Sequence, residues 1–385
     1  MPGIPTWRSR CRNRAILPRH NVVRFYSGHA FNYRHSTIHP KGIPVMRIQP
    51  LFFKKRAISS LVLAMWITAM SVSTFAEEKD VRGFPDLKRR SVTFWSDGTR
   101  LAGDLTYPAN IKEGEKLPTL VMCHGWGGLK RHLNGMIGPQ FAKEGYVVFT
   151  FDYRGWGESD SRLVVTGEMP KPDADGMITV KALAIRQLVD PLDQQEDIDA
   201  AITFVEGESI VDTDRIGIWG SSFGGGHVIW RAAHDDRVKC VLAQVGAMNQ
   251  RLGVVAQYGA GGKDGHKEIH AEKIRRVRGE LAPVPLGQEK PEGLTGDPYY
   301  ERFYEFVPVD FTDNITCPVL ILDADQEHYF DNKEHGGRVY EQLKGRVPVE
   351  YHLLKNTGHY DVYAKSLKQV MSLELPFLEK HLKNR

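Results

Sequence analysis

Residues 215–226 read RIGIWGSSFGGG, a stretch in which an apolar run ends at a serine flanked by glycines. Its G-x-S-x-G pattern is centred on Ser222, and a helical stretch follows over residues 227–233. A serine on a sharp strand-to-helix turn adopts strained dihedral angles that expose its Oγ, and side chains at Gly220 and Gly224 would clash there. The helix N-terminus just beyond the turn also favours a developing oxyanion. We therefore predict that Ser222 is a nucleophile.

Strand and helix patterns alternate on both sides of this stretch. Six apolar runs lack polar alternation, which is typical of strands buried on both faces of a parallel sheet. Their residue ranges are 119–123, 146–151, 216–219, 239–245, 319–322 and 349–354. The clearest helix begins at Asp190-Pro191, an N-cap followed by proline at the first helical position. This alternation predicts an α/β fold with a doubly wound, mostly parallel sheet.

Two segments depart from the alternation. Residues 91–95 and 100–107 alternate in polarity and are joined by Asp97-Gly98, the preferred dipeptide of a tight hairpin. Residues 249–313 are rich in glycine, charged and aromatic side chains. The length of this second segment predicts a cap inserted between two strands of the sheet.

A second glycine-rich motif, HGWGG over residues 124–128, ends an earlier predicted strand. Glycines after a strand let the backbone turn and present its N–H groups. The N–H of Trp126 is therefore expected to form an oxyanion hole together with the N–H of Phe223. His124 is not expected to be the catalytic base, because it precedes the nucleophile in the chain.

A third stretch, FDYRGWGES over residues 151–159, is similar to a D-x-R-G-x-G-x-S segment of one large enzyme superfamily. With the two glycine motifs, it makes residues 91–385 resemble the α/β-hydrolase superfamily, in the branch shared by dienelactone-hydrolase-like and Xaa-Pro-peptidase-like enzymes. The resemblance implies an α/β-hydrolase fold. Asp152 and Arg154 are expected to brace loops rather than to contact substrate.

The resemblance also implies the chain order nucleophile, acid, base. In the superfamily the acid follows the next-to-last strand at a G-x-x-D position, and aligning Ala324 with that glycine assigns the acid to Glu327. Glutamate is permitted in this role, and Asp325 and Asp331 are the alternatives. The predicted base is His359, which follows the last strand and precedes the C-terminal helix.

The N-terminal residues resemble a targeting segment. Residues 1–76 carry twelve Lys and Arg but no Asp or Glu. From Met46 onward, a basic segment, an uncharged and largely apolar stretch over 57–73 and small residues before Glu77 have the layout of a secretory signal peptide. The protein is therefore expected to be exported, either to a periplasm or by secretion. An uncleaved signal anchor that tethers the protein to a membrane and an Arg-rich transit peptide are the alternatives.

This interpretation divides the chain into three parts. Residues 1–45 are expected to be a non-structural extension upstream of the real start, 46–76 the signal peptide and 77–385 the hydrolase domain. Outside residues 1–76 the chain has 39 basic and 47 acidic residues, a net charge near −8. Such a surface offers no electrostatic footprint for nucleic acid or for an anionic membrane. After signal cleavage, no stable membrane insertion is expected.

No metal or organic cofactor is expected. Cys123, Cys240 and Cys317 are an odd, widely spaced set beside apolar runs, so we interpret them as buried free thiols rather than disulfides or zinc ligands. The carboxylates over 323–334 have the spacing of a calcium loop, but His328 occupies the position where that loop needs glycine.

These residues predict a serine hydrolase that cleaves a carboxylic ester-like acyl bond of a small molecule through a Ser-His-Glu triad and an acyl-enzyme. The resemblance leaves alternatives: a serine peptidase of the Xaa-Pro-peptidase-like type, an acyltransferase, or a non-catalytic binding module. Xaa-Pro peptidases carry a large extra β domain for which this chain has no room, and true dienelactone hydrolases use a cysteine nucleophile. The physiological substrate, the substrate-binding residues and the oligomeric state are not predicted. Several aromatic side chains either line an apolar pocket or pack the cap onto the body, namely Trp126, Trp156, Phe223, Tyr258, Tyr299, Tyr300 and Phe303.

Overall fold

The computed structural model describes most of the chain after the N-terminal segment. The described residues are 78–135, 137–252, 263–288 and 293–384. The extension and the signal peptide predicted within residues 1–76 lie outside the described residues and stay predictions. Among the helices that the structure describes, none is both long and apolar enough to cross a membrane.

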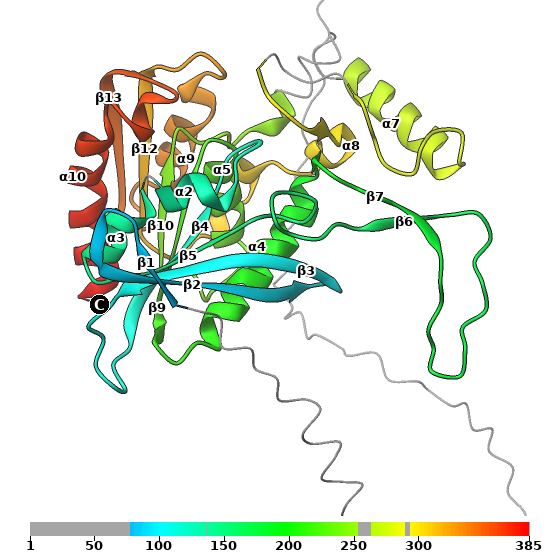
Figure 1. Ribbon diagram of the computed structural model, residues 1–385. Coiled ribbons are helices and arrows are strands. Elements are labelled where there is room, and N and C mark those ends of the chain that lie inside the picture. The colour runs from blue at the N-terminus through cyan, green and yellow to red at the C-terminus, as the bar shows by residue number, and fades with distance from the viewer. Residues whose placement is uncertain (1–77, 136, 253–262, 289–292, 385) are drawn as a thin grey trace, which may run out of the picture. The chain divides into compact units, whose positions relative to one another are not determined.

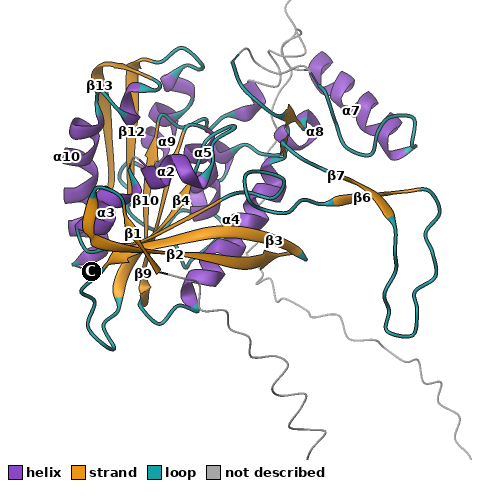
Figure 2. Ribbon diagram, in the orientation of Figure 1, coloured by secondary structure: helices purple, strands orange, loops and turns teal. Residues whose placement is uncertain are grey.

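A nine-stranded sheet forms the centre of the domain (Figures 1 and 2). In spatial order its strands are β1 (Glu78–Val81), β2 (Phe84–Ser96), β3 (Thr99–Pro108), β5 (Val147–Phe151), β4 (Leu117–Cys123), β9 (Val211–Ser221), β10 (Cys240–Gln244), β12 (Val319–Gln326) and β13 (Val349–Gly358). The pairs from β1 to β5 are antiparallel, and every pair from β5 to β13 is parallel. The predicted mostly parallel sheet is confirmed.

Helices cover both faces of this sheet, as a doubly wound fold requires. One hydrophobic core includes side chains of α4 (Pro191–Glu206), α5 (Phe223–Ala232) and α9 (Gly336–Leu343). The core on the opposite face includes side chains of α2 (Lys130–Gly135), α3 (Gly138–Lys143) and α10 (Leu367–Leu378). The described part of the chain therefore has three layers, helix, sheet and helix.

The central strand β4 shows why the apolar runs lack alternation. Leu120 and Met122 point into one core, while Val121 and Cys123 point into the other, and all four are fully buried. A strand with both faces covered must be apolar at every position. Cys123, Cys240 and Cys317 are buried, as predicted, and none of the three forms a disulfide within the described residues.

The structure contains the predicted hairpin turn between β2 and β3 and the predicted start of helix α4. Asp97 and Gly98 have φ angles of 43° and 74°, which are the left-handed values that a two-residue hairpin turn between β2 and β3 needs. Asp190 caps α4 by accepting hydrogen bonds from the N–H groups of Leu192 and Asp193. The helix predicted over 227–233 begins earlier, directly after Ser222.

The predicted cap, residues 249–313, lies in the chain between β10 and β12. Its described part contains α7 (Lys263–Val277), β11 (Asp297–Pro298), α8 (Tyr300–Phe303) and the short helices η1 (Pro308–Asp310) and η2 (Thr312–Asn314). A second excursion was not predicted: the hairpin of β6 (Leu163–Thr166) and β7 (Lys181–Ala184), followed by β8 (Leu188–Val189). Strand β11 of the cap pairs with β8, so the two excursions are joined beside the N-terminus of α4.

Candidate active site

Ser222 occupies the strained turn between β9 and α5. Its φ and ψ angles are 57° and −122°, values that a residue with a side chain adopts only when its surroundings hold it there. A Cβ atom at Gly220 would lie 2.1 Å from the carbonyl oxygen of Gly224, and one at Gly224 would lie 2.1 Å from that of Cys123. The two glycines are therefore steric requirements of the turn.

The side chains of Ser222, His359 and Glu327 form one hydrogen-bonded chain. Ser222 Oγ lies 2.9 Å from His359 Nε2, and His359 Nδ1 lies 2.6 Å from Glu327 Oε2. The side chains of His359 and Glu327 are 1% and 3% exposed. Because the carboxylate accepts the Nδ1 proton, the neutral imidazole presents a lone pair at Nε2 to the serine hydroxyl.

Glu327 is held as a carboxylate acceptor. Burial raises its pKa, but the hydrogen bond and charge of His359 and the N–H groups of Tyr329 and His328 outweigh burial and leave the pKa below its ordinary value. Both N–H groups donate to Glu327 Oε1 at 2.9 Å. An ionised carboxylate fixes the tautomer of His359 and stabilises its protonated form.

The two alternative acids point elsewhere. Asp325 Oδ1 accepts the N–H of Thr357 at 3.1 Å, and Asp331 Oδ1 accepts that of Lys333 at 2.9 Å. Among the candidate acids, the structure brings only Glu327 to His359.

Ser221, the neighbour of Ser222, is already engaged. Its Oγ accepts hydrogen bonds from Tyr363 Oη at 2.6 Å and from Gln244 Nε2 at 2.9 Å, and the residue is 1% exposed. Neither of these hydrogen bonds involves His359. Of the two adjacent serines, only Ser222 has a base beside it.

The HGWGG loop lies directly against the turn. A Cβ atom at Gly125 would lie 3.0 Å from Ser222 Cβ. Within the described residues, no acceptor is recorded for the N–H of Trp126 or for that of Phe223, the first residue of α5. Trp126 Nε1 donates to the carbonyl oxygen of Thr295 at 2.8 Å, which ties this loop to the cap. The arrangement leaves both predicted oxyanion donors free to bind a ligand.

His124 takes no part in the hydrogen-bonded chain at Ser222. Its Nδ1 donates to the carbonyl oxygen of Gly125 at 3.0 Å, and burial lowers its pKa to about 4. Asp152 accepts the N–H groups of Lys130 and Glu158. Arg154 pairs with the buried Asp197. The expected bracing roles of Asp152 and Arg154 agree with these contacts.

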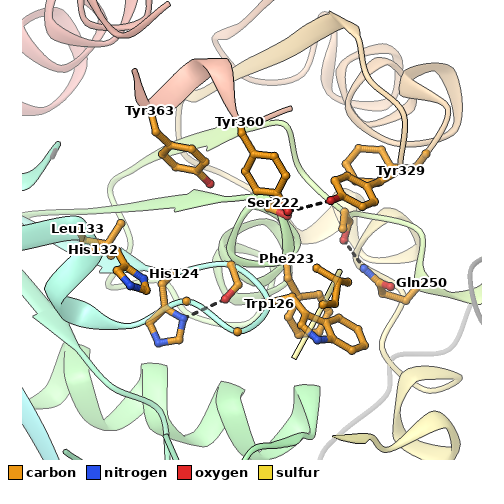
Figure 3. Close-up of a pocket in the computed structure, with 16 residues that line it drawn as sticks. His124, Trp126, His132, Leu133, Ser222, Phe223, Gln250, Tyr329, Tyr360 and Tyr363 are labelled. Atoms are coloured by element: carbon orange, nitrogen blue, oxygen red, sulfur yellow. Dashed lines mark hydrogen bonds between the residues drawn. The ribbon is translucent and has the colours of Figure 1, made fainter. Parts of the chain in front are cut away.

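A cavity of about 420 Å³ opens at Ser222 (Figure 3). In this view His132 and Leu133 lie on one side of Ser222, and Trp126 and Gln250 lie on the other. None of the described lining residues is Asp, Glu, Lys or Arg. The lining consists of His124, Gly125, Trp126, Gly127, Gly128, His132, Leu133, Ser222, Phe223, Ala247, Gln250, Leu294, Tyr329, Phe330, Tyr360 and Tyr363.

The aromatic residues predicted near the site divide into two groups. Trp126 and Phe223 line the cavity. Phe303 instead packs on both of them at 5.4 Å between ring centroids, so it fixes the cap to the body. Trp156, Tyr299 and Tyr300 also do not line the cavity, and Tyr258 lies outside the described residues.

The tyrosines that border the cavity were not predicted, although a sequence signal existed. Tyr329 follows Glu327 by two residues, and Tyr360 follows His359 directly. Proximity in sequence to two predicted catalytic residues was the available clue. Among the described residues, no group of three or more His, Cys, Asp or Glu side chains is arranged to hold a metal ion.

Fold and site geometry together define an α/β hydrolase, and comparisons with known proteins agree. Residues 97–361 match the family model described as X-Pro dipeptidyl-peptidase (S15 family). The chain belongs to this family.

Related proteins match most of the chain. An uncharacterized 31.7 kDa protein of Escherichia coli, from the traX-finO intergenic region, is 28% identical over 305 residues, which cover 74% of this chain and 98% of that protein. The quorum-quenching protein AidA of Acinetobacter baumannii is 26% identical over 292 residues, covering 68% of this chain and 86% of its own.

Solved structures share the fold. The hypothetical protein PA2218 of Pseudomonas aeruginosa has a TM-score of 0.60 at 20% identity, covering 77% of this chain and 94% of its own. The α/β hydrolase GrgF of a Penicillium species has a TM-score of 0.56 at 20% identity, covering 76% and 99%.

Proposed function

We propose that this chain hydrolyses the carboxylic ester-like acyl bond of an uncharged substrate, with Ser222 as the nucleophile. One observation carries the proposal: the hydrogen-bonded chain from Ser222 through His359 to Glu327 meets a cavity whose described lining is uncharged. A serine becomes nucleophilic when an oriented base can take its proton.

The mechanism follows from the positions of the groups. His359 Nε2 removes the proton of Ser222 as Oγ attacks the acyl carbon, and the Glu327 carboxylate stabilises the imidazolium that forms. The N–H groups of Phe223 and Trp126 donate to the oxyanion of the tetrahedral intermediate. His359 then gives the proton to the leaving oxygen, and water releases the acyl group from Ser222 by the same steps in reverse.

The cavity lining favours an ester over an X-Pro dipeptide. A dipeptidyl-peptidase substrate carries a free α-ammonium group close to the scissile bond, and burying that charge without a carboxylate partner is costly. Among the described residues, the carboxylate at the site is that of Glu327, and it is already bonded to His359 and to two N–H groups. A structure of Est1E from Butyrivibrio proteoclasticus with ferulic acid bound has the same fold, with a TM-score of 0.54.

A paired assay tests this choice. The full-length chain is given a 4-nitrophenyl ester of a short fatty acid and, separately, Gly-Pro-4-nitroanilide, and kcat/KM is measured for both. We expect turnover of the ester that is lost in Ser222→Ala, and turnover of the dipeptide at least about a hundredfold lower, since an unpaired buried charge costs several kcal/mol. Faster cleavage of the dipeptide would overturn the ester assignment and favour the peptidase alternative.

Acyl transfer is the second candidate, because it uses the same residues with another acceptor in place of water. Matched relatives include the polyketide transferase grgF of a Penicillium species, 24% identical over 317 residues. Adding alcohols to the ester assay separates the two reactions. A new ester product formed at the expense of the free acid would identify a transferase, whereas hydrolysis unchanged by acceptors identifies a hydrolase.

A further inference from the structure

Two tyrosines form a hydrogen-bonded pair beside the base of the triad. The hydroxyl oxygens of Tyr329 and Tyr360 are 2.8 Å apart, and both residues line the cavity (Figure 3). Their rings meet the ring of His359 edge to face, with centroid distances of 4.8 Å and 5.1 Å. The pair therefore borders His359 from two loops, one that carries the acid and one that carries the base.

The two hydroxyls carry two protons, and the hydrogen bond between them uses one. In a bond between two hydroxyls one donates and the other accepts, so the accepting tyrosine keeps its own O–H for another partner. No further hydrogen bond of either hydroxyl is recorded among the described residues. The third tyrosine of the cavity differs, because Tyr363 Oη donates to the buried Ser221. The Tyr329–Tyr360 pair thus offers one free donor at the cavity.

The position of His359 indicates which part of a substrate this donor meets. Its Nε2 takes the serine proton and passes it to the leaving oxygen, so the leaving group must lie beside that atom. The oxyanion lies instead at the N–H groups of Phe223 and Trp126. Because the two tyrosine rings contact the His359 ring, they border the leaving-group side of the site.

We propose that Tyr329 and Tyr360 form a leaving-group subsite that selects esters whose alcohol part carries a hydrogen-bond-accepting oxygen. This inference rests on the hydrolase function proposed above and adds a specificity to it. A bound ester without such an oxygen displaces water from the spare O–H and forgoes this hydrogen bond; because Tyr329 and Tyr360 are 39% and 55% exposed, the hydroxyl keeps access to solvent and we expect a modest preference. Sites built to hydrogen-bond a substrate discriminate against analogues that lack the partner atom.

Two esters of one fatty acid test the subsite, the 2-methoxyethyl ester and the n-butyl ester. Their alcohol parts have the same length and differ by one oxygen in place of a methylene. We measure kcat/KM, which reports the step in which the leaving group departs. The wild-type chain is expected to prefer the methoxyethyl ester by about fivefold, a typical effect of one hydrogen bond. The double variant Y329F/Y360F, which keeps both rings, is expected to lose this preference.

The single variants Y329F and Y360F each leave one tyrosine hydroxyl with a proton to donate, so the variant that loses the preference identifies the tyrosine that donates to the ester. Tyr340→Phe on α9, outside the cavity, is the matched control and is expected to retain the preference. A double variant that still prefers the methoxyethyl ester as wild type does, or a wild type without preference, would overturn the subsite.

Labelling of Ser222 by a fluorophosphonate separates this outcome from failure of the proposed function. A double variant that is labelled at the wild-type rate has an intact triad, so its ester preference reports on the subsite alone. A wild-type chain that neither labels nor hydrolyses either ester would instead overturn the hydrolase function, and the subsite with it.

Discussion

Two carbonyl oxygens leave no room for a side chain on either side of Ser222. A Cβ atom at Gly220 would lie 2.1 Å from the carbonyl oxygen of Gly224, and a Cβ atom at Gly224 would lie 2.1 Å from that of Cys123. Both distances are far inside van der Waals contact. The close approach comes from α5 starting directly after the serine while β4 ends beside it. The partial exposure of Ser222 and the tight packing around it thus have one structural cause.

Gly224→Ala is expected to disrupt the turn. The added methyl must displace the backbone of β4, so we expect a loss of several kcal/mol of stability and of most ester turnover, as is typical of overpacking against the backbone. Gly207→Ala is the control, since the nearest atom to its Cβ is 3.4 Å away and its φ is −78°. Thermal unfolding and ester assays of both variants check the prediction, and equal behaviour of the two would contradict it.

The three side chains of the hydrogen-bonded chain could be selected from the sequence because they follow strand ends in a fixed order. Ser222 and His359 each stand directly beside a strand or its end, and the structure brings Glu327 to them as the alignment suggested. The choice against Asp325 required the structure, because loop geometry rather than spacing directs its carboxylate to Thr357. The cavity lining was mostly not predictable, since it gathers side chains from six separate stretches of the chain.

At the scale of elements, burial on both faces explains why the sheet strands could be predicted and the β6–β7 hairpin could not. All four residues of β7 are exposed, so no apolar pattern marks it.

Helix α10 contains a buried acidic side chain, that of Glu374. Glu374 is fully buried and accepts a hydrogen bond from Trp219 Nε1 of β9 at 3.0 Å, and burial raises its pKa to about 8.

Glu374 is expected to make stability fall as pH rises. Its folded-state pKa lies above the ordinary value of 4.5, so the folded state holds a proton that the unfolded state releases between pH 4.5 and 8. Stability is then fully present below pH 4.5 and declines by about 1.4 kcal/mol per pH unit across this window. The variant Glu374→Gln has no carboxyl group to ionise, so its free energy of unfolding should rise relative to that of the wild type between pH 5 and pH 8. Urea unfolding at both pH values measures this, and an equal difference at the two values would contradict it.

At the scale of the whole molecule, the parallel sheet aligns the strand ends that carry the site. Ser222 follows β9, Glu327 follows β12 and His359 follows β13, and all three strands run in the same direction. In open α/β sheets, ligand sites form outside these carboxyl ends. The cap is tied to the same region by Arg302, which pairs with Asp190 at the start of α4. The described body thus carries Ser222, Glu327 and His359, and the cap supplies Gln250 and Leu294 to the cavity.

The central claim is that Ser222 is a nucleophile activated by His359, and a fluorophosphonate probe tests it most directly. The full-length chain is incubated with the probe, digested and analysed by mass spectrometry, beside Ser222→Ala and Ser221→Ala. We expect one adduct on Ser222, absent from Ser222→Ala and present in Ser221→Ala, because of these two adjacent serines only Ser222 has a base at hydrogen-bonding distance from its Oγ. A folded chain that takes up no probe, or an adduct on Ser221, would contradict the claim.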